Sequence, residues 1–190
     1  MIKAIIFDCF GVVRDDPSKV TYEFFGGDWE KDKEELLELF YKSDKGYIKS
    51  TAPFVAERLG IDVDVWRNAL QTASGINEEL LKYILELKKT YKVAMLSNVG
   101  PGGLERWFDA GFLDIYFEVQ VASGDIGFAK PEPEAYEIAA DRLGVRLDEC
   151  VFTDDRPGYV EGAQAVGMKT ILFTSTEQFK KELTKILKTY

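Results

Sequence analysis

The feature that most constrains the fold is the apolar run at the start of the chain, residues 2–7, which ends in Asp8 and is soon followed by Gly11. Five of its six residues are apolar, without clean alternation. Such a run is typical of a strand covered on both faces, as in a parallel sheet with helices on either side. Ligands of such sheets bind beyond the carboxyl ends of the strands. We therefore expect Asp8 at a binding edge, where Gly11 allows a sharp turn.

Length and charge narrow the class of protein. The 190 residues suffice for one α/β domain with an insertion. The net charge of −9 argues against nucleic acid or an anionic membrane as a partner. No apolar run is long enough to span a bilayer, and the N-terminus has no signal-peptide pattern. We therefore expect a cytoplasmic protein with no membrane or nucleic-acid partner.

The absence of histidine and the presence of two cysteines exclude several kinds of site. Without histidine, neither a Ser-His or Cys-His nucleophile pair nor a His-ligated zinc site is possible. Cys9 follows the end of one expected strand and Cys150 begins another. Opposite ends of parallel strands lie beyond disulfide reach, so we expect both cysteines to be small core residues.

The chain between residues 14 and 76 lacks strand signals and shows helical patterns, at 17–25, 31–43, 46–59 and 62–73. It predicts a small all-helical insertion at 14–76, flanked by a core of residues 1–13 and 77–190. Several aromatic side chains are expected to form the core of the insertion and not a ligand cage: Phe24, Trp29, Tyr47, Phe54 and Trp66.

Helix and strand alternate in the rest of the chain. Helical patterns occupy 77–90, 101–110, 131–143, 157–166 and a last segment from residue 175. Strand patterns occupy 92–96, 116–121, 150–153 and 169–173. With the first strand, this alternation predicts an α/β fold with a doubly wound, parallel five-stranded sheet.

Several polar residues should meet at one edge of that sheet. Asp8, Ser97 and the pair Asp154 and Asp155 each follow an apolar strand, and Lys130 opens a helix from the same edge. Carboxylates gathered in this way raise one another's pKa, and a divalent cation would relieve the repulsion. Because the available ligands are oxygens, with no histidine, the set points to Mg²⁺ shared with a phosphate.

The same edge supports phosphoryl chemistry. Mg²⁺ and Lys130 would neutralise a phosphoryl group, while Ser97 and Asn98 would hold its oxygens. Asp8 would then attack phosphorus and form an aspartyl-phosphate. Taken singly, each residue is as well explained by a turn or a helix cap. Their occurrence together, in this order and at strand ends, favours the functional interpretation.

Four motifs carry a resemblance to a known family: residues 7–12, 96–98, 130–133 and 152–157. In this order they resemble the motifs of the haloacid dehalogenase (HAD) superfamily of aspartate-nucleophile hydrolases, in the branch with a helical cap after the first strand. The resemblance covers essentially the whole chain. It implies a sheet order of 5-4-1-2-3 and a cap at the insertion that covers the crevice and selects the substrate.

The resemblance also implies roles for individual residues. Asp8 would be the nucleophile, Ser97 a donor to a phosphate oxygen, and Lys130 the charge that steadies both. Asp155 would bind Mg²⁺ directly and Asp154 directly or through water. Asp8 and the backbone carbonyl of Phe10 would complete the ligands.

The chain departs from the family pattern at Phe10. The phosphatases of the family carry a second aspartate there, which protonates the leaving group and later activates water; losing such proton transfer typically costs about 10²–10⁴-fold in rate. An aromatic residue at this position is similar to the metal-independent 2-haloacid dehalogenases. Those enzymes generally lack a pair such as Asp154 and Asp155, which here favours a metal. Tyr159 also departs from the Asn or Asp of many members.

These observations favour a Mg²⁺-dependent, phosphatase-like hydrolase of small phosphorylated metabolites, slowed by Phe10. Two alternatives stay open: a metal-independent 2-haloacid dehalogenase, and a member of the fold that binds a ligand or partner with little turnover. We expect a monomer or homodimer, and the sequence does not identify the substrate.

Overall fold

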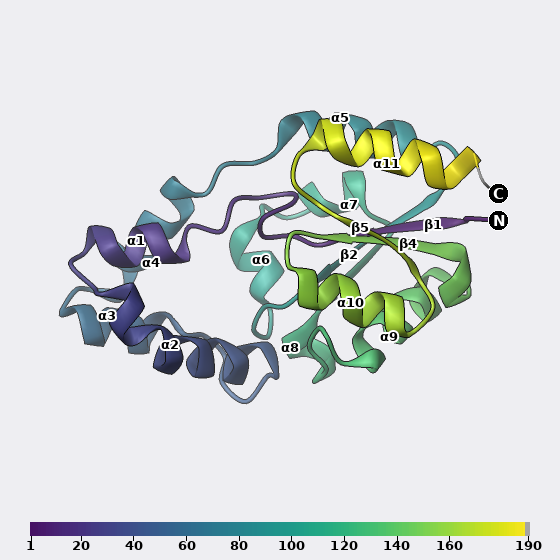
Figure 1. Cartoon of the computed structure of the whole chain (residues 1–190). Coiled ribbons are helices and arrows are strands. Elements are labelled where there is room, and N and C mark those ends of the chain that lie inside the picture. Colours follow the sequence, from purple (N-terminus) through teal and green to yellow (C-terminus); the bar gives the residue numbers. More distant parts are fainter. Residues whose placement is uncertain (189–190) are drawn as a thin grey trace.

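The computed structural model describes residues 1–188 and centres on one parallel sheet (Figure 1). Its order is β3-β2-β1-β4-β5, which confirms the predicted order. The strands are β1 (Ala4–Phe7), β2 (Lys92–Ser97), β3 (Val119–Ala122), β4 (Cys150–Asp154) and β5 (Lys169–Leu172). All four residues of the central strand β1 are buried, as its unbroken apolar run predicts.

Helices cover both faces of the sheet, and β1 divides its side chains between them (Figure 1). Ile5 and Phe7 pack on the face covered by α5 (Glu78–Leu87) and α11 (Thr176–Lys188). Ala4 and Ile6 pack on the opposite face, under α9 (Pro133–Leu143) and α10 (Pro157–Ala165). The doubly wound α/β fold is therefore confirmed.

The segment between β1 and α5 forms four helices, which we call the helical insertion: α1 (Ser18–Phe24), α2 (Trp29–Asp44), α3 (Ala52–Leu59) and α4 (Val63–Ala73). These helices pack around a hydrophobic cluster of their own, which includes Tyr22, Leu36, Val55 and Trp66. Figure 1 shows the insertion to one side of the sheet, beyond the carboxyl ends of the strands.

The insertion leaves and rejoins the sheet at one place. The N–H of Asp15 donates to the carbonyl of Gly75 at 3.0 Å, and the N–H of Asn77 donates to the carbonyl of Val13 at 2.9 Å. Arg14 forms an antiparallel bridge with Ile76. The two linkers therefore run side by side and are paired through their backbones.

The expected helix over 46–59 is wrong in its first half, because α3 begins only at Ala52. Gly46 has a φ of +77°, and a Cβ there would lie 2.5 Å from the carbonyl oxygen of Gly124 in the core. The hydroxyl of Ser50 accepts a hydrogen bond from the N–H of Ala52 at 3.2 Å. The segment before α3 is thus shaped by contact with the core and not by helical propensity.

Short helices accompany β3: α6 (Gly103–Trp107), α7 (Phe112–Tyr116) and α8 (Ser123–Ile126), with a 3₁₀ turn η1 (Leu147–Glu149) before β4. The sequence patterns did not predict α7 or α8. The aromatic residues of the insertion also differ from expectation, because Phe24, Tyr47 and Phe54 are 79%, 69% and 50% exposed.

Cys9 and Cys150 are both buried and unpaired, as predicted. They lie at opposite ends of neighbouring strands, since Cys150 pairs with Ala4 while Cys9 follows the end of β1. Within residues 1–188, no helix combines the length and the hydropathy that crossing a bilayer would require.

Candidate active site

The carboxyl ends of the central strands bring the predicted polar residues together. Asp8 follows β1, Ser97 ends β2, and Asp154 ends β4. The backbone N–H of Asp8 donates to the carbonyl of Thr153 at 2.9 Å, which fixes the start of the loop after β1. These side chains emerge at one edge because the strands are parallel and in register.

Lys130 joins two of these carboxylates. Its ammonium is fully buried and donates to Oδ1 of Asp8 at 2.5 Å and to Oδ2 of Asp154 at 2.6 Å. Burial disfavours the charged form of Lys130, but the charges and hydrogen bonds of Asp8 and Asp154 outweigh it and raise its pKa. The lysine is therefore a fixed positive charge beside Asp8.

Three carboxylates form a cluster around this charge. Asp8, Asp154 and Asp155 each offer an oxygen within 4.8 Å of the others. Burial raises the pKa of Asp8 to about 7; Lys130 opposes the rise and Asp154 adds to it. Burial and the charge of Asp154 likewise raise the pKa of Asp155. Excess negative charge of this kind, presented by hard oxygen donors, suits Mg²⁺.

Gly11 makes room for the outermost of these carboxylates. Its φ is +91°, and a Cβ at this position would lie 2.3 Å from Oδ2 of Asp155. A side chain at position 11 would therefore displace the carboxylate from the cluster. The glycine serves both the turn after β1 and the position of Asp155.

The side chain of Phe10 can neither donate nor accept a proton. It packs edge-on against Trp107, with ring centroids 5.0 Å apart. It lines the same pocket as Asp8. Within the described chain, its backbone carbonyl accepts no hydrogen bond from another backbone N–H. That oxygen is therefore available as a ligand, whatever the side chain is.

Ser97 and Asn98 have different surroundings. The Ser97 hydroxyl is buried and makes no hydrogen bond among residues 1–188, which is costly unless a ligand completes it. The Asn98 amide instead clamps the backbone of Lys130: its Nδ2 donates to the Lys130 carbonyl at 2.9 Å, and its Oδ1 accepts from the Lys130 N–H at 2.9 Å. Both ends of this amide therefore bond to the backbone of Lys130 and position that residue. The predicted contact of the Asn98 side chain with substrate stays a prediction.

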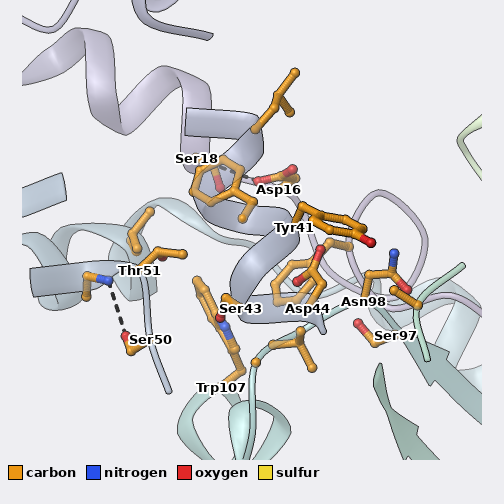
Figure 2. Close-up of a pocket in the computed structure, with 18 of the residues that line it drawn as sticks. Asp16, Ser18, Tyr41, Ser43, Asp44, Ser50, Thr51, Ser97, Asn98 and Trp107 are labelled. Carbon is orange, nitrogen blue, oxygen red and sulfur yellow. Dashed lines mark hydrogen bonds between the residues drawn. The ribbon is translucent and has the colours of Figure 1, made fainter. Parts of the chain in front are cut away.

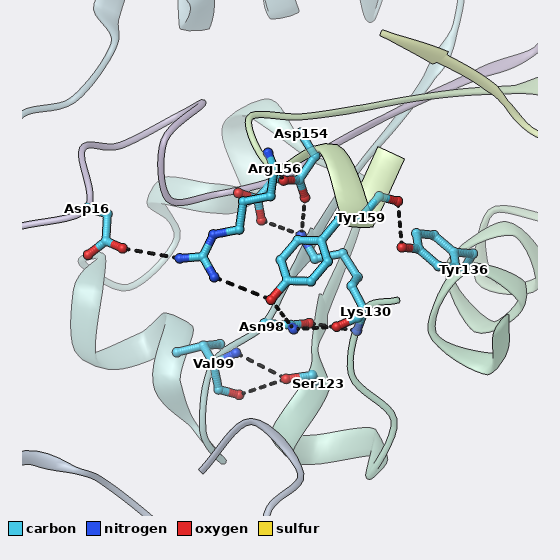
Figure 3. Close-up of polar contacts among 10 residues, drawn as sticks. Asp16, Asn98, Val99, Ser123, Lys130, Tyr136, Asp154, Arg156 and Tyr159 are labelled. Carbon is cyan, nitrogen blue, oxygen red and sulfur yellow. Dashed lines mark hydrogen bonds and ion pairs between the residues drawn. The ribbon is translucent and has the colours of Figure 1, made fainter. Parts of the chain in front are cut away.

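Tyr159 and Arg156 form a polar wall that the sequence did not predict (Figure 3). Nη1 of Arg156 donates to the Tyr159 hydroxyl at 3.3 Å, and Nη2 donates to Asp16 at 3.4 Å. The Tyr159 ring lies 5.1 Å from the Lys130 ammonium. Asp16 comes from the linker into the insertion, so this contact joins the two halves of the site. Two signals pointed toward this wall: Arg156 lies within the motif 152–157, and Tyr159 departs from the family pattern.

A pocket of about 1050 Å³ lies above the sheet edge and is lined from both sides (Figure 2). The sheet side supplies Asp8, Ser97 and Lys130. The insertion supplies an aromatic wall that includes Trp29 and Trp66. These two aromatic residues therefore face the crevice as well as the cluster within the insertion.

The insertion is held against the core by polar contacts around this pocket. Lys45, just after α2, pairs with Glu132 at 2.6 Å. The guanidinium of Arg106 donates to the carbonyl of Lys49 at 3.2 Å, and Nε2 of Gln71 donates to the carbonyl of Arg106 at 2.7 Å. Contacts from the middle of the insertion and from its last helix therefore join it to the core beside the pocket.

Relatives in sequence are mostly phosphatases and hydrolases. The chain is 27% identical over 206 aligned residues to D-ribitol-5-phosphate phosphatase of Bacteroides thetaiotaomicron, an alignment that covers 98% of this chain and 99% of that protein. It is 43% identical over 61 residues to phosphatase MT3486 of Mycobacterium tuberculosis, which covers 32% of this chain but only 28% of the relative.

Solved structures share the fold. A HAD-like family hydrolase of Porphyromonas gingivalis superposes with a TM-score of 0.78 at 26% identity, covering 98% of both chains. A HAD family enzyme of Bacteroides thetaiotaomicron, in complex with magnesium and inorganic phosphate, has a TM-score of 0.74 at 23% identity over 93% of this chain and 96% of that one. The haloacid dehalogenase-like hydrolase family matches residues 2–167. The chain therefore belongs to the haloacid dehalogenase-like hydrolases.

Proposed function

We propose that this protein is a Mg²⁺-dependent phosphatase of small phosphorylated metabolites that works through an aspartyl-phosphate on Asp8. The observation that carries the proposal is the buried Lys130 ammonium, held between Asp8 and Asp154 at the floor of the pocket. A relative aligned over 98% of this chain is named for its action on a small phosphorylated polyol, D-ribitol 5-phosphate. That likeness supports a phosphorylated metabolite over a haloacid.

The donor set supports Mg²⁺ as the cofactor. Asp8, Asp154, Asp155 and the carbonyl of Phe10 would hold the ion, and the space left by Gly11 keeps Asp155 in the cluster. When bound, Mg²⁺ would offset the charge of the carboxylates and of the phosphoryl group.

Asp8, Lys130 and Ser97 would each have a separate role in the reaction. One oxygen of Asp8 attacks phosphorus, and the bond to the leaving-group oxygen breaks. The Lys130 ammonium neutralises charge on the nucleophile and on the phosphoryl oxygens, while the unpaired Ser97 hydroxyl donates to one of those oxygens. Attack by water on the aspartyl-phosphate then releases inorganic phosphate and restores Asp8.

We further propose that residues 14–76 act as a cap over a core of residues 1–13 and 77–190. The hydrophobic cluster within α1–α4 supports this division, because the insertion has a core of its own. The lining of the pocket supports the role, because the insertion supplies its outer wall. Substrate choice would then depend on the insertion and the reaction on the sheet edge.

A second candidate is a 2-haloacid dehalogenase, and the observation that favours it is Phe10, which cannot protonate a leaving group. One relative, (S)-2-haloacid dehalogenase 4A of Burkholderia cepacia, is 33% identical over 81 residues, which is 43% of this chain. The crowded pair Asp154 and Asp155 counts against it, since a halide leaving group requires no metal. A third candidate is a low-turnover binder of phosphorylated ligands.

The test is phosphate release from 4-nitrophenyl phosphate, with Mg²⁺ and with excess chelator. We expect release that requires Mg²⁺ and is abolished by Asp8→Asn, whose melting temperature should stay near or above that of the parent because a crowded carboxylate is removed. Chloride release from 2-chloropropionate without metal would replace the proposal with the dehalogenase. Phosphate binding without release of either product would favour the binder.

A further inference from the structure

The proposed reaction requires a proton donor that the sheet edge does not supply. When an alkyl phosphate is cleaved, the leaving oxygen must take up a proton, and water must later lose one. Phe10 can do neither. Asp154 is held by the Lys130 ammonium at 2.6 Å and by the Arg156 N–H at 2.9 Å, so it is occupied as an acceptor.

Within the described chain, four carboxyl groups line the pocket: Asp8, Asp16, Asp44 and Glu132. Three of the four are engaged by other groups. Asp8 is bound by Lys130. Asp16 accepts from the guanidinium of Arg156 and from the N–H of Ser18. Glu132 is paired with Lys45. The remaining group, Asp44, forms neither an ion pair nor a side-chain hydrogen bond with any of residues 1–188.

The insertion carries Asp44 into the pocket that Asp8 also lines. Asp44 is the last residue of α2 and is half-buried. Figure 2 shows its carboxyl among Tyr41, Asn98 and Ser97 on the wall of the pocket. The positive charge of Lys130, the residue that holds Asp8, acts on this carboxyl. A substrate with its phosphate at Asp8 would extend into the pocket whose wall includes Asp44.

We propose that Asp44 is the general acid and base of this site, supplied by the insertion in place of the side chain at position 10; the inference rests on the proposed phosphatase function. As Asp8 attacks phosphorus, the P–O bond to the leaving group breaks and that oxygen takes the proton of Asp44. Asp44, now a carboxylate, then takes a proton from the attacking water. Phosphate leaves, Asp8 is regenerated, and Asp44 is again protonated.

The surroundings of Asp44 suit a group that must both give and take a proton. Burial raises its pKa to about 6; Arg156 and Lys130 oppose the rise, and Asp16 adds to it. The end of α2 also disfavours a negative charge, because the helix dipole is negative there. The charged and titratable groups around it are Arg156, Lys130 and Asp16, with Tyr41 and Lys45 from its own segment.

The first test compares leaving groups in Asp44→Asn, with Glu38→Gln as the matched control. Glu38 is an exposed carboxylate of the same helix, paired with Lys42. With an alkyl phosphate, which requires a proton, Asp44→Asn should lose about 10²–10⁴-fold in kcat/KM. With 4-nitrophenyl phosphate the acylphosphate should still form quickly, giving a burst of nitrophenolate followed by slow turnover, because water is no longer activated. Glu38→Gln should behave as the parent.

The second test uses pH and rescue. For the alkyl phosphate, kcat/KM of the parent should fall as the pH rises above about 6, because the first step requires protonated Asp44. Asp44→Asn should lose this limb, and Asp44→Glu should keep part of it. Adding Phe10→Asp to Asp44→Asn should restore turnover, because it supplies an acid from the sheet side.

The outcomes separate this inference from the proposed function. Equal losses with both leaving groups, confined to KM, without a burst and without rescue by Phe10→Asp, would show that Asp44 only binds substrate. Parent activity that is unaltered in Asp44→Asn would also overturn the inference while leaving the phosphatase standing. Failure of the parent to release phosphate from either substrate would overturn the phosphatase itself. Melting curves monitor folding, and the asparagine variant should melt no lower, because a half-buried carboxyl that makes no hydrogen bond is replaced by an amide of similar size.

Discussion

At the scale of single residues, the site depends on a residue without a side chain as much as on its charged residues. Gly11 carries no chemistry, yet its missing side chain is what allows Asp155 to join Asp8 and Asp154. The conformation of Gly11 adds a second constraint, since its φ of +91° is rarely adopted by other residues. A side chain at position 11 would therefore strain the backbone and would also collide with Asp155. Mutations can separate these two effects.

Gly11→Ala should weaken Mg²⁺ activation, because its Cβ would meet the carboxylate of Asp155 at 2.3 Å. Gly26→Ala is the matched control: its φ is +87°, and nothing lies within 4 Å of the added Cβ. Both variants should lose about 1–3 kcal/mol of unfolding free energy from strain. Only Gly11→Ala should raise the Mg²⁺ concentration needed for half-maximal phosphatase activity. Equal Mg²⁺ titrations for the two variants would contradict a role for Gly11 in placing Asp155.

At the scale of elements, the paired linkers are held by a buried guanidinium. Arg14 is 7% exposed and forms no ion pair with a carboxylate in the described part of the chain. It donates to Ser74 Oγ at 2.8 Å and to Gln71 Oε1 at 3.0 Å on the insertion side, and to the carbonyl of Trp107 at 2.9 Å in the core. Its guanidinium also lies 5.1 Å from the ring of Trp107. Burial lowers the pKa of Arg14, and Cys9 and Asp15 oppose this effect. The neutral acceptors therefore share in stabilising the guanidinium charge.

Arg14→Lys should therefore destabilise the protein although it keeps the charge. A lysine ammonium cannot reach all three acceptors in the fork geometry of a guanidinium. We expect a loss of about 1.5–3 kcal/mol in the free energy of unfolding, measured by urea denaturation. Arg67→Lys is the control, because Arg67 is an exposed residue paired only with Asp64. Equal stability of the two variants would mean that charge alone, and not the fork, satisfies position 14.

At the scale of the whole molecule, the insertion and the sheet edge form one pocket only while they are in contact. Lys45 and Glu132 make one of the ion pairs that join them, beside the motif that carries Lys130. The pair is partly buried, with Lys45 only 10% exposed, so solvent screens it less than a surface pair. Glu132 also lines the pocket.

Lys45→Met should lower kcat/KM for the alkyl phosphate while changing the free energy of unfolding by only about 1 kcal/mol. The reason is that the variant loosens docking without opening a cavity in either hydrophobic core. A double-mutant cycle with Glu132→Gln should show non-additive losses in kcat/KM. Additive losses would indicate that each residue acts separately and that the ion pair does not hold the pocket closed.

Much of this architecture follows from the order of apolar runs along the chain. Because three strand runs are followed by Asp8, Ser97 and the pair Asp154 and Asp155, and Lys130 opens a helix from the same edge, the cluster could be predicted. The helix boundaries near Gly46 could not, because they depend on contact with Gly124 in the core. The exposure of Phe24 was also not predictable, since the helical pattern does not show how four short helices pack.

Two contacts within the site could not be predicted from the sequence, for a related reason. The clamp of Asn98 on the Lys130 backbone joins residues 32 positions apart, and nothing in either motif indicates it. Asp44 stands in no motif and becomes notable only once α2 is seen over the sheet edge. Contacts between the insertion and the core are set by tertiary packing, which local patterns do not encode.

The side-by-side linkers also bear on how such proteins diversify. Since Asp15 pairs with Gly75, and Val13 with Asn77, the chain returns almost to the point it left. The sheet therefore imposes little on the length or shape of the segment between these pairs. A different segment could be grafted there during evolution without altering the strand ends. In such a protein, new substrates can arise by exchange of one module while an old reaction is inherited intact.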